Sequence, residues 1–168
     1  MKMKRLIFFG SLRSIKLLQI VIGRDVEEQS LNKGFIKNAR LYQVKNETFP
    51  YIELNNDFPE KVECLVVNDL QNEDIDKIQF FESTEYQLEN IDCEIDNEIK
   101  NYQYFKLIRP NKTQNSWNFQ EWQKKFEDYD CECAKLWMEL FDEYKHDSEK
   151  AEIFWPEMLT KLEKFKKE

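Results

Sequence analysis

Histidine is almost missing from this chain, which has one, His146, among its 168 residues. A single histidine excludes the usual Ser-His-Asp and Cys-His catalytic arrangements and any histidine-rich metal site. The sequence also has no Walker loop, no dinucleotide-binding fingerprint and no internal repeat. The catalytic chemistry that remains is that of the carboxylates, and Asp and Glu together number 33.

Long hydrophobic runs are missing as well. No apolar stretch approaches the length that crosses a membrane, and the apolar run before Gly10 is too short for the core of a signal peptide. In a chain without an export signal, the four cysteines are interpreted as reduced thiols. Cys131 and Cys133 have one residue between them and no second pair, so we expect no zinc site, and core packing for Cys133. These features predict a cytoplasmic protein that is not held at a membrane.

The charge of the chain is unevenly distributed. Residues 1–49 have a net charge of +6, residues 50–100 of −12 and residues 101–168 of −2, which gives the total of −8. The basic residues of the first third are scattered, and the molecule as a whole would repel phosphates. We therefore predict no binding of nucleic acid, and we expect the first two segments to lie near each other in one domain.

Short alternating or β-branched segments are separated by turn residues over the first two thirds of the chain, which predicts strands. Two short helices are expected among them. One is capped by Ser14 and stopped by Gly23, and the other is capped by Asn72. This pattern predicts the α+β class, as a small mixed β-barrel with flanking helices. The expected strands are 5–9, 34–44, 49–54, 62–67, 86–95 (with a bulge) and 102–108.

After a polar connector at 110–116 the pattern becomes helical. Apolar residues recur at steps of three and four from Phe119 to Leu140, as one long helix or as two broken near 128–130. Ser148 caps a further segment that ends at Trp155-Pro156, and Pro156 is placed to open a final helix. We expect a domain at 1–125 and a helical extension at 126–168 packed on it, because the apolar stripe would otherwise be exposed. A flexible charged tail fits residues 164–168 better.

The segment Arg5 to Arg13 is an apolar run that ends abruptly in Gly10-Ser11, just before the helix that Ser14 caps. Such a strand, tight loop and helix start aims several backbone N–H groups at one point, with the helix dipole behind them. The loop therefore suits a carboxylate or an oxyanion. The same residues also fit an ordinary turn between a strand and a helix.

Glu82 is distinguished from the other carboxylates by its context. It follows Phe80 and Phe81 at the end of a predicted helix, just before a strand. A carboxylate held against aromatic surface has a raised proton affinity, which a general base near neutral pH requires. The alternative is a solvated glutamate at a helix end, and that is the role we expect for its neighbour Glu85.

Six segments follow one another along the chain: Phe8-Phe9-Gly10-Ser11-Leu12-Arg13, Leu17 to Arg24, Phe49-Pro50-Tyr51-Ile52, Val62 to Val67 with Leu70, Phe81-Glu82-Ser83-Thr84-Glu85-Tyr86 and Trp117 to Trp122. Together, and in this order, they resemble the gamma-glutamylcyclotransferase-like family over about residues 4–125. The family has a small β-barrel with flanking helices, and its members release 5-oxoproline from gamma-glutamyl compounds. The resemblance therefore implies the same barrel and a small-molecule gamma-glutamyl substrate, with no metal or cofactor.

The resemblance also implies residue roles. Glu82 falls on the catalytic glutamate of the family, which acts as general acid and base. Tyr86 falls on a tyrosine of the pocket, and the loop after the first strand holds the gamma-glutamyl group. The implied substrate-binding residues are Phe9, Gly10, Ser11, Leu12, Arg13 and Tyr86.

Two positions depart from the family pattern. Phe9 replaces the loop tyrosine, which removes a hydroxyl, and Ser83 replaces a glycine and takes a positive φ less easily. These departures and the long C-terminal extension favour an alternative, a catalytically inactive binding or interaction module with the same fold. The sequence leaves the leaving amine and the oligomeric state open.

Overall fold

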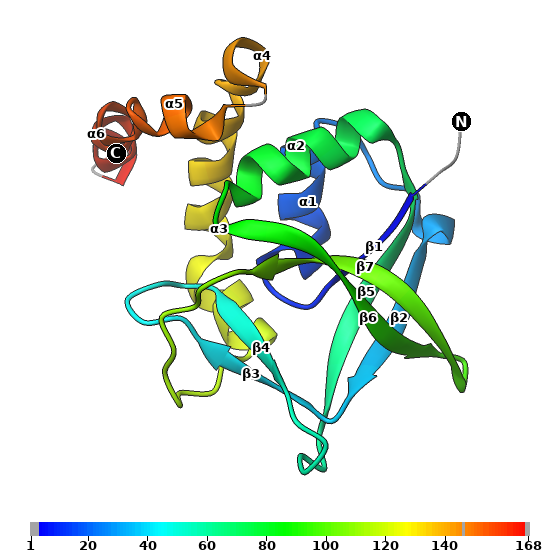
Figure 1. The fold of residues 1–168 in the computed structure, drawn as a ribbon. Helices are drawn as coiled ribbons and strands as arrows, with labels where there is room; N and C mark the ends of the chain where they lie inside the picture. Colours follow the sequence, from blue (N-terminus) through cyan, green and yellow to red (C-terminus); the bar gives the residue numbers. More distant parts are fainter. Residues whose placement is uncertain (1–3, 146, 167–168) are drawn as a thin grey trace.

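A five-stranded barrel forms the centre of the molecule, and helices cover one side of it (Figure 1). The computed structural model describes residues 4–145 and 147–166, so that His146 lies outside the described residues. The barrel closes in the order β1-β5-β2-β6-β7 through a parallel pairing of β1 with β7, while its other pairings are antiparallel. The barrel strands are β1 (Lys4–Phe8), β2 (Leu31–Lys37), β5 (Lys61–Leu70), β6 (Tyr86–Ile95) and β7 (Glu98–Leu107).

The remaining elements surround the barrel. Strands β3 and β4 form a separate hairpin-like sheet, and the helices are distributed between the strands and the C-terminal part. The predicted α+β class, with a mixed barrel and C-terminal helices, is confirmed. These elements are β3 (Ala39–Gln43), β4 (Pro50–Leu54), η1 (Ser11–Arg13), η2 (Glu28–Ser30), α1 (Ile15–Ile22), α2 (Asn72–Glu82), α3 (Phe119–Met138), α4 (Phe141–Tyr144), α5 (Ser148–Glu152) and α6 (Trp155–Lys166).

The prediction of one strand over 34–44 is wrong, because the chain turns at Asn38. Asn38 has a φ of 53° and its side-chain amide donates to the carbonyl oxygen of Phe58 at 2.7 Å. Asparagine adopts this left-handed conformation at small cost, so it ends β2 and directs β3 out of the barrel. Apolar residues such as Ile36 and Leu41 lie on both sides of this turn, and no glycine or proline marks it, so the pattern alone does not reveal it.

The hairpin of β6 and β7 also differs from expectation. Its register runs without a shift from Tyr86 opposite Leu107 to Ile95 opposite Glu98, so the predicted bulge in β6 is absent. Strand β7 begins four residues earlier than predicted, at Glu98. The turn residues Asp96 and Asn97 both have positive φ, as a tight two-residue hairpin connection requires.

Local capping explains where the first two helices begin and end. The Ser14 hydroxyl accepts a hydrogen bond from the backbone N–H of Leu17 at 3.1 Å, and Gly23 ends α1 with a φ of 72°. Both ends are as predicted. Helix α2 is capped by Gln71 rather than by Asn72, and Asp74 completes this capping box by accepting from the backbone N–H of Gln71.

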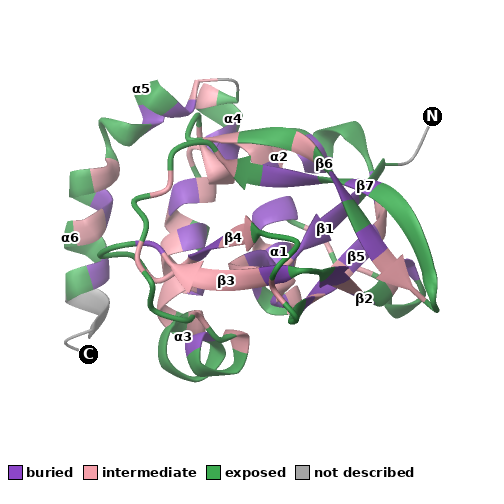
Figure 2. Cartoon of the chain, turned by 60° about the horizontal axis from the view of Figure 1, so that its bottom comes forward, coloured by how far each residue is buried: buried purple, intermediate pink, exposed green. Residues whose placement is uncertain are grey.

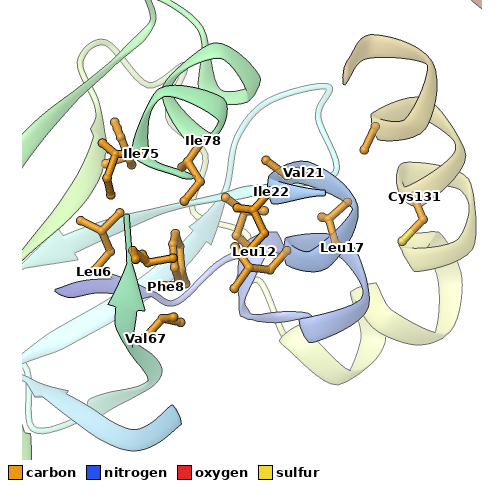
Figure 3. Packing of buried hydrophobic residues seen from close by; sticks show 14 of the residues in the cluster. Leu6, Phe8, Leu12, Leu17, Val21, Ile22, Val67, Ile75, Ile78 and Cys131 are labelled. Atoms are coloured by element: carbon orange, nitrogen blue, oxygen red, sulfur yellow. The ribbon is translucent and has the colours of Figure 1, made fainter. Parts of the chain in front are cut away.

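Helix α1 is packed between the barrel and two other helices, and this arrangement fixes the loop that precedes it. In Figure 3, the α1 side chains Leu17, Val21 and Ile22 lie between the barrel residues on one side and Cys131 of α3 on the other. Side chains this fully buried typically contribute about 1.5–3 kcal/mol each. The β1–α1 connection is therefore held at both ends.

Helix α3 runs without a break through 128–130, and the expected domain boundary at 125/126 lies inside it. It packs on α1, and α6 contacts it from the side away from the barrel, where Figure 1 shows α6 crossing α3 at a steep angle. Ser148 begins α5, although Asp147 caps it, and Pro156 is the second residue of α6.

Figure 2 shows buried residues on the inner side of α3, whereas β6 and β7 are exposed along much of their length. No helix among the described residues is both long and apolar enough to cross a lipid bilayer.

Candidate active site

A cavity of about 430 Å³ opens at the place where the β1–α1 loop, the segment 47–50 and the C-terminal end of α2 meet α3. Six of the seven residues implied by the resemblance line this cavity, although they come from segments some 70 positions apart. They are Phe9, Gly10, Ser11, Leu12, Glu82 and Tyr86. Arg13 is not among the lining residues.

Glu82 is the last residue of α2, and its side chain is half-buried in the cavity wall. In the described part of the chain, its carboxyl group has neither a hydrogen bond nor an ion pair. Burial raises the pKa of Glu82 to about 8, because the charged form loses hydration without gaining a partner. The group can therefore change its protonation state near neutral pH.

Ser83 adopts the unusual backbone conformation that ends α2. Its φ is 73° and its ψ is −174°, a region populated almost only by glycine. Two hydrogen bonds with Gln79 hold it there: the Ser83 N–H donates to the Gln79 carbonyl at 2.9 Å, and the Gln79 side-chain amide donates to the Ser83 carbonyl at 3.1 Å. Ser83 stands where the resembled family has a glycine. It adopts a positive φ although its side chain makes this conformation less favourable.

The β1–α1 loop is a single 3₁₀ turn. The N–H of Arg13 donates to Gly10 O at 3.0 Å, whereas the N–H groups of Ser11 and Leu12 donate to no acceptor in the described structure. These two N–H groups are available to an anion. Gly10 itself has a negative φ, and a Cβ there would lie 3.2 Å from the ring of Pro50, so the close approach of segment 47–50 favours glycine.

Two aromatic side chains, Phe9 and Tyr86, line the cavity next to the loop and Glu82. The ring of Phe9 packs against Tyr104 with 5.6 Å between centroids. Tyr86 lines the cavity beside Glu82, and burial together with the nearby carboxylates raises the pKa of its phenol well above the ordinary value. The phenol therefore stays protonated at neutral pH, and its O–H can donate a hydrogen bond.

Arg13 points elsewhere. Its guanidinium forms an ion pair with Glu63 of β5 and lies 4.4 Å from the centre of the Phe119 ring. Both contacts fasten the loop to the barrel and to the start of α3.

The sequence did not indicate the part of the cavity lining that α3 and α6 provide through Tyr129, Asp130, Cys133 and Trp155. Asp130 is held in place, since its Oδ2 accepts from the indole N–H of Trp122 at 2.8 Å and from the Thr48 hydroxyl at 3.1 Å. Cys133 lies at the cavity, and it is Cys131 that packs in the core. Thr48 and Asp130 are 82 positions apart, so no local pattern could pair them.

Carboxylates dominate the polar lining of the cavity. Glu47 and Glu85 line it in addition to Glu82 and Asp130, and both are exposed, as expected for Glu85. Among residues 4–145 and 147–166, no three His, Cys, Asp or Glu side chains are placed to hold a metal ion together.

Comparison with known proteins agrees with this geometry. The family model described as gamma-glutamyl cyclotransferase, AIG2-like, matches residues 6–124. The chain belongs to this family. Membership supports a cyclotransferase-type function in general terms, and it confirms the resemblance drawn from the motifs. No curated protein matches the chain.

Solved structures share the cyclotransferase fold of this chain. The Arabidopsis thaliana protein At5g39720.1 has a TM-score of 0.57 at 16% identity, covering 83% of this chain and 93% of its own. At3g28950.1 from the same plant has a TM-score of 0.58 at 13% identity, covering 85% and 86%. YkqA from Bacillus subtilis has a TM-score of 0.51 at 16% identity, covering 72% of this chain and 41% of its own. At these identities the likeness is one of fold.

The cyclotransferase family match ends at residue 124, and four residues that line the cavity lie beyond it. They are Tyr129, Asp130, Cys133 and Trp155. The cavity lining thus combines the matched segment, with Glu82 and the β1–α1 loop, and the C-terminal helices.

Proposed function

We propose that this protein is a gamma-glutamylcyclotransferase-type enzyme that releases 5-oxoproline from a gamma-glutamyl amine or peptide. Its reaction uses no metal or cofactor, and Glu82 is the general acid and base. The observation that supports this best is the desolvated carboxyl group of Glu82, which has no partner and lines the same cavity as the free N–H groups of Ser11 and Leu12. The cysteine content fits a cytoplasmic location.

In the proposed reaction, the α-amine of the substrate attacks its own γ-carbonyl carbon, which forms the C–N bond of a five-membered ring. Glu82 takes the proton that the attacking nitrogen loses and returns it to the departing amine as the original C–N bond breaks. Holding the chain in ring-closing geometry supplies a further part of the rate enhancement. The products are 5-oxoproline and the free amine.

The loop and Tyr86 bind the negative charges of the substrate. The N–H groups of Ser11 and Leu12 bind the α-carboxylate or the oxyanion that develops on the γ-carbonyl, and the neutral Tyr86 phenol donates a hydrogen bond in the same cavity. Phe9 supplies apolar surface in place of a hydroxyl.

The raised pKa of Glu82 suits this role. With a pKa of about 8, roughly a tenth of the carboxyl groups are ionised at pH 7 in the empty site. A substrate ammonium group beside Glu82 favours the ionised form, so that binding itself prepares the base. The protonated form then serves as the acid for the leaving amine.

The alternative is a binding module that retains the fold without turnover. It is favoured by the loss of the loop hydroxyl at Phe9, whose ring instead packs on Tyr104, and by the strained backbone at Ser83. In that case, the cavity binds a gamma-glutamyl compound and leaves it intact.

The two functions are separated by incubating purified, chelator-treated protein with gamma-glutamyl amines and peptides and measuring 5-oxoproline by mass spectrometry. We expect time-dependent release of 5-oxoproline together with equimolar free amine. Binding without release across the panel would replace the enzyme by the binding module.

A further inference from the structure

The turn that leads from β3 into β4 lines the cavity with residues 47–50. The last of them, Pro50, packs against Gly10, where a Cβ would lie 3.2 Å from the proline ring. Gly10 directly precedes Ser11 and Leu12, whose N–H groups have no acceptor in the described structure and are available to an anionic group of the substrate. The position of segment 47–50 therefore limits the space in which that group binds.

Thr48 fastens this segment to the region of α3 through both its side chain and its backbone. Its hydroxyl donates to Asp130 Oδ2 at 3.1 Å, and its carbonyl oxygen accepts from the indole N–H of Trp117 at 2.8 Å. The two partners lie 82 and 69 positions further along the chain. Segment 47–50 is thus held in place by tertiary packing as well as by the hairpin to which it belongs.

Asp130 is a fixed partner for Thr48. The same Oδ2 accepts from the indole N–H of Trp122 at 2.8 Å, and Trp122 is buried in the core. The Trp122 ring lies against those of Trp117 and Phe119, with 6.3 and 5.7 Å between ring centroids. One aromatic cluster therefore fixes both groups that hold Thr48.

We propose that Asp130 is a positioning residue of the enzyme: through its hydrogen bond with Thr48 it holds segment 47–50 against the β1–α1 loop, and so strengthens binding of the gamma-glutamyl group. This inference rests on the proposed function, and it concerns a residue beyond the family match, which ends at residue 124. Asp130 acts through Thr48 and not by its charge on the substrate. A binding contact of this kind supports the bound substrate and the transition state alike, so its loss raises KM and leaves kcat nearly unchanged.

Thr48→Val tests the hydrogen bond, because it removes the hydroxyl and keeps the shape of the side chain. We expect KM for a gamma-glutamyl amide to rise about three- to tenfold, the usual effect of one hydrogen bond. The value of kcat should stay within about twofold of the wild type. Thr48→Ser restores the hydroxyl and should restore KM.

Thr160→Val is the matched control. Thr160 is an exposed residue of α6 whose hydroxyl donates to the carbonyl oxygen of Pro156, and it is not among the described residues that line the cavity. This variant loses a threonine hydroxyl as well, but KM and kcat should be those of the wild type.

Asp130→Asn and Asp130→Leu separate positioning from a direct effect of the charge. Both side-chain hydrogen bonds of Asp130 are made to one oxygen, so the amide oxygen of asparagine can accept both, and KM should stay close to the wild-type value. Leucine accepts neither, and KM should rise at least as much as in Thr48→Val. The double variant Thr48→Val/Asp130→Leu should have the KM of Asp130→Leu alone, because both changes remove the same hydrogen bond.

The outcomes separate this inference from the proposed function. Melting curves establish that each variant is folded, and should Asp130→Leu fail to fold, Thr48→Val and Asp130→Asn still decide. A wild-type KM in Thr48→Val overturns the inference, and so does a rise in KM in Asp130→Asn equal to that in Thr48→Val, because the charge of Asp130 then acts on the substrate itself. Both results leave the cyclotransferase in place. Failure of the wild type to release 5-oxoproline from any gamma-glutamyl compound removes the proposed function, and this inference with it.

Discussion

The indole of Trp137 stacks on the ring of Phe80, with 5.1 Å between ring centroids and 22° between the ring planes. The Trp137 N–H also donates to the carbonyl oxygen of Phe80 at 3.2 Å. Phe80 lies two residues before Glu82 in α2, so this contact joins α3 to the end of the helix that carries the candidate catalytic group. The position of Glu82 thus depends on a residue of the C-terminal extension.

Replacement of Trp137 therefore tests whether the extension is docked on the barrel domain. Trp137→Ala should lower the free energy of unfolding by about 3–5 kcal/mol, as expected for a buried tryptophan. Trp137→Phe keeps much of the stacking, and its cost should be nearer the ~1 kcal/mol of one hydrogen bond. Urea unfolding measures both values. A change below about 0.5 kcal/mol for the alanine variant would show that the extension is not docked.

Glu82→Gln should abolish most turnover without unfolding the protein. Glutamine retains the shape of the side chain but accepts no proton from the substrate amine, so kcat should fall by ~10²–10⁴-fold. Asp76→Asn is the matched control, an exposed carboxylate on the same helix. Steady-state kinetics of 5-oxoproline release provide the comparison. Full turnover by Glu82→Gln, with a substrate that the wild type consumes, would contradict the mechanism.

The same group should make stability depend on pH. Folding raises the pKa of Glu82 from 4.5 to about 8, so unfolding between these values releases a proton. The stability that Glu82 contributes is complete below pH 4.5. The free energy of unfolding then falls as the pH rises from 4.5 through 8, by up to about 1.4 kcal/mol per pH unit.

Glu82→Gln removes this dependence. Its stability relative to the wild type should therefore increase as the pH is raised from 5 to 8.5, as measured by urea unfolding at fixed ionic strength. A constant difference between the two proteins over this range would mean that the carboxyl group is not desolvated in the folded state.

Ser83→Gly should stabilise the fold. The backbone at Ser83 lies in a region that costs a residue with a side chain about 1–3 kcal/mol, and glycine avoids this cost, although it adds some freedom to the unfolded chain. We expect a net gain of about 1 kcal/mol in thermal or urea unfolding. Ser148→Gly, at the start of α5, is a suitable control and should destabilise instead, because glycine is a poor helix former. A loss of stability in Ser83→Gly would show that the serine is not strained.

Local sequence signals determined those features that depend on residues next to one another in the chain, such as helix ends. Ser14 and Gly23 bound α1 because one side-chain oxygen and one positive φ suffice for each end. The position of Glu82 after two phenylalanines, at the end of a helix, likewise followed from neighbouring residues. The turn at Asn38 did not, because asparagine tolerates both extended and left-handed backbone and apolar residues lie on both sides of it.

The tertiary structure alone decided how the cavity is composed. Closure of the barrel brings the β1–α1 loop to Glu82, and the packing of α3 on α1 brings Asp130 to Thr48. The same packing occupies Arg13 with Glu63 and Phe119, away from the cavity. A sequence pattern reports contacts only within a few residues along the chain. Which distant side chains share a site depends on the close packing of whole helices and strands, to which every part of the core contributes.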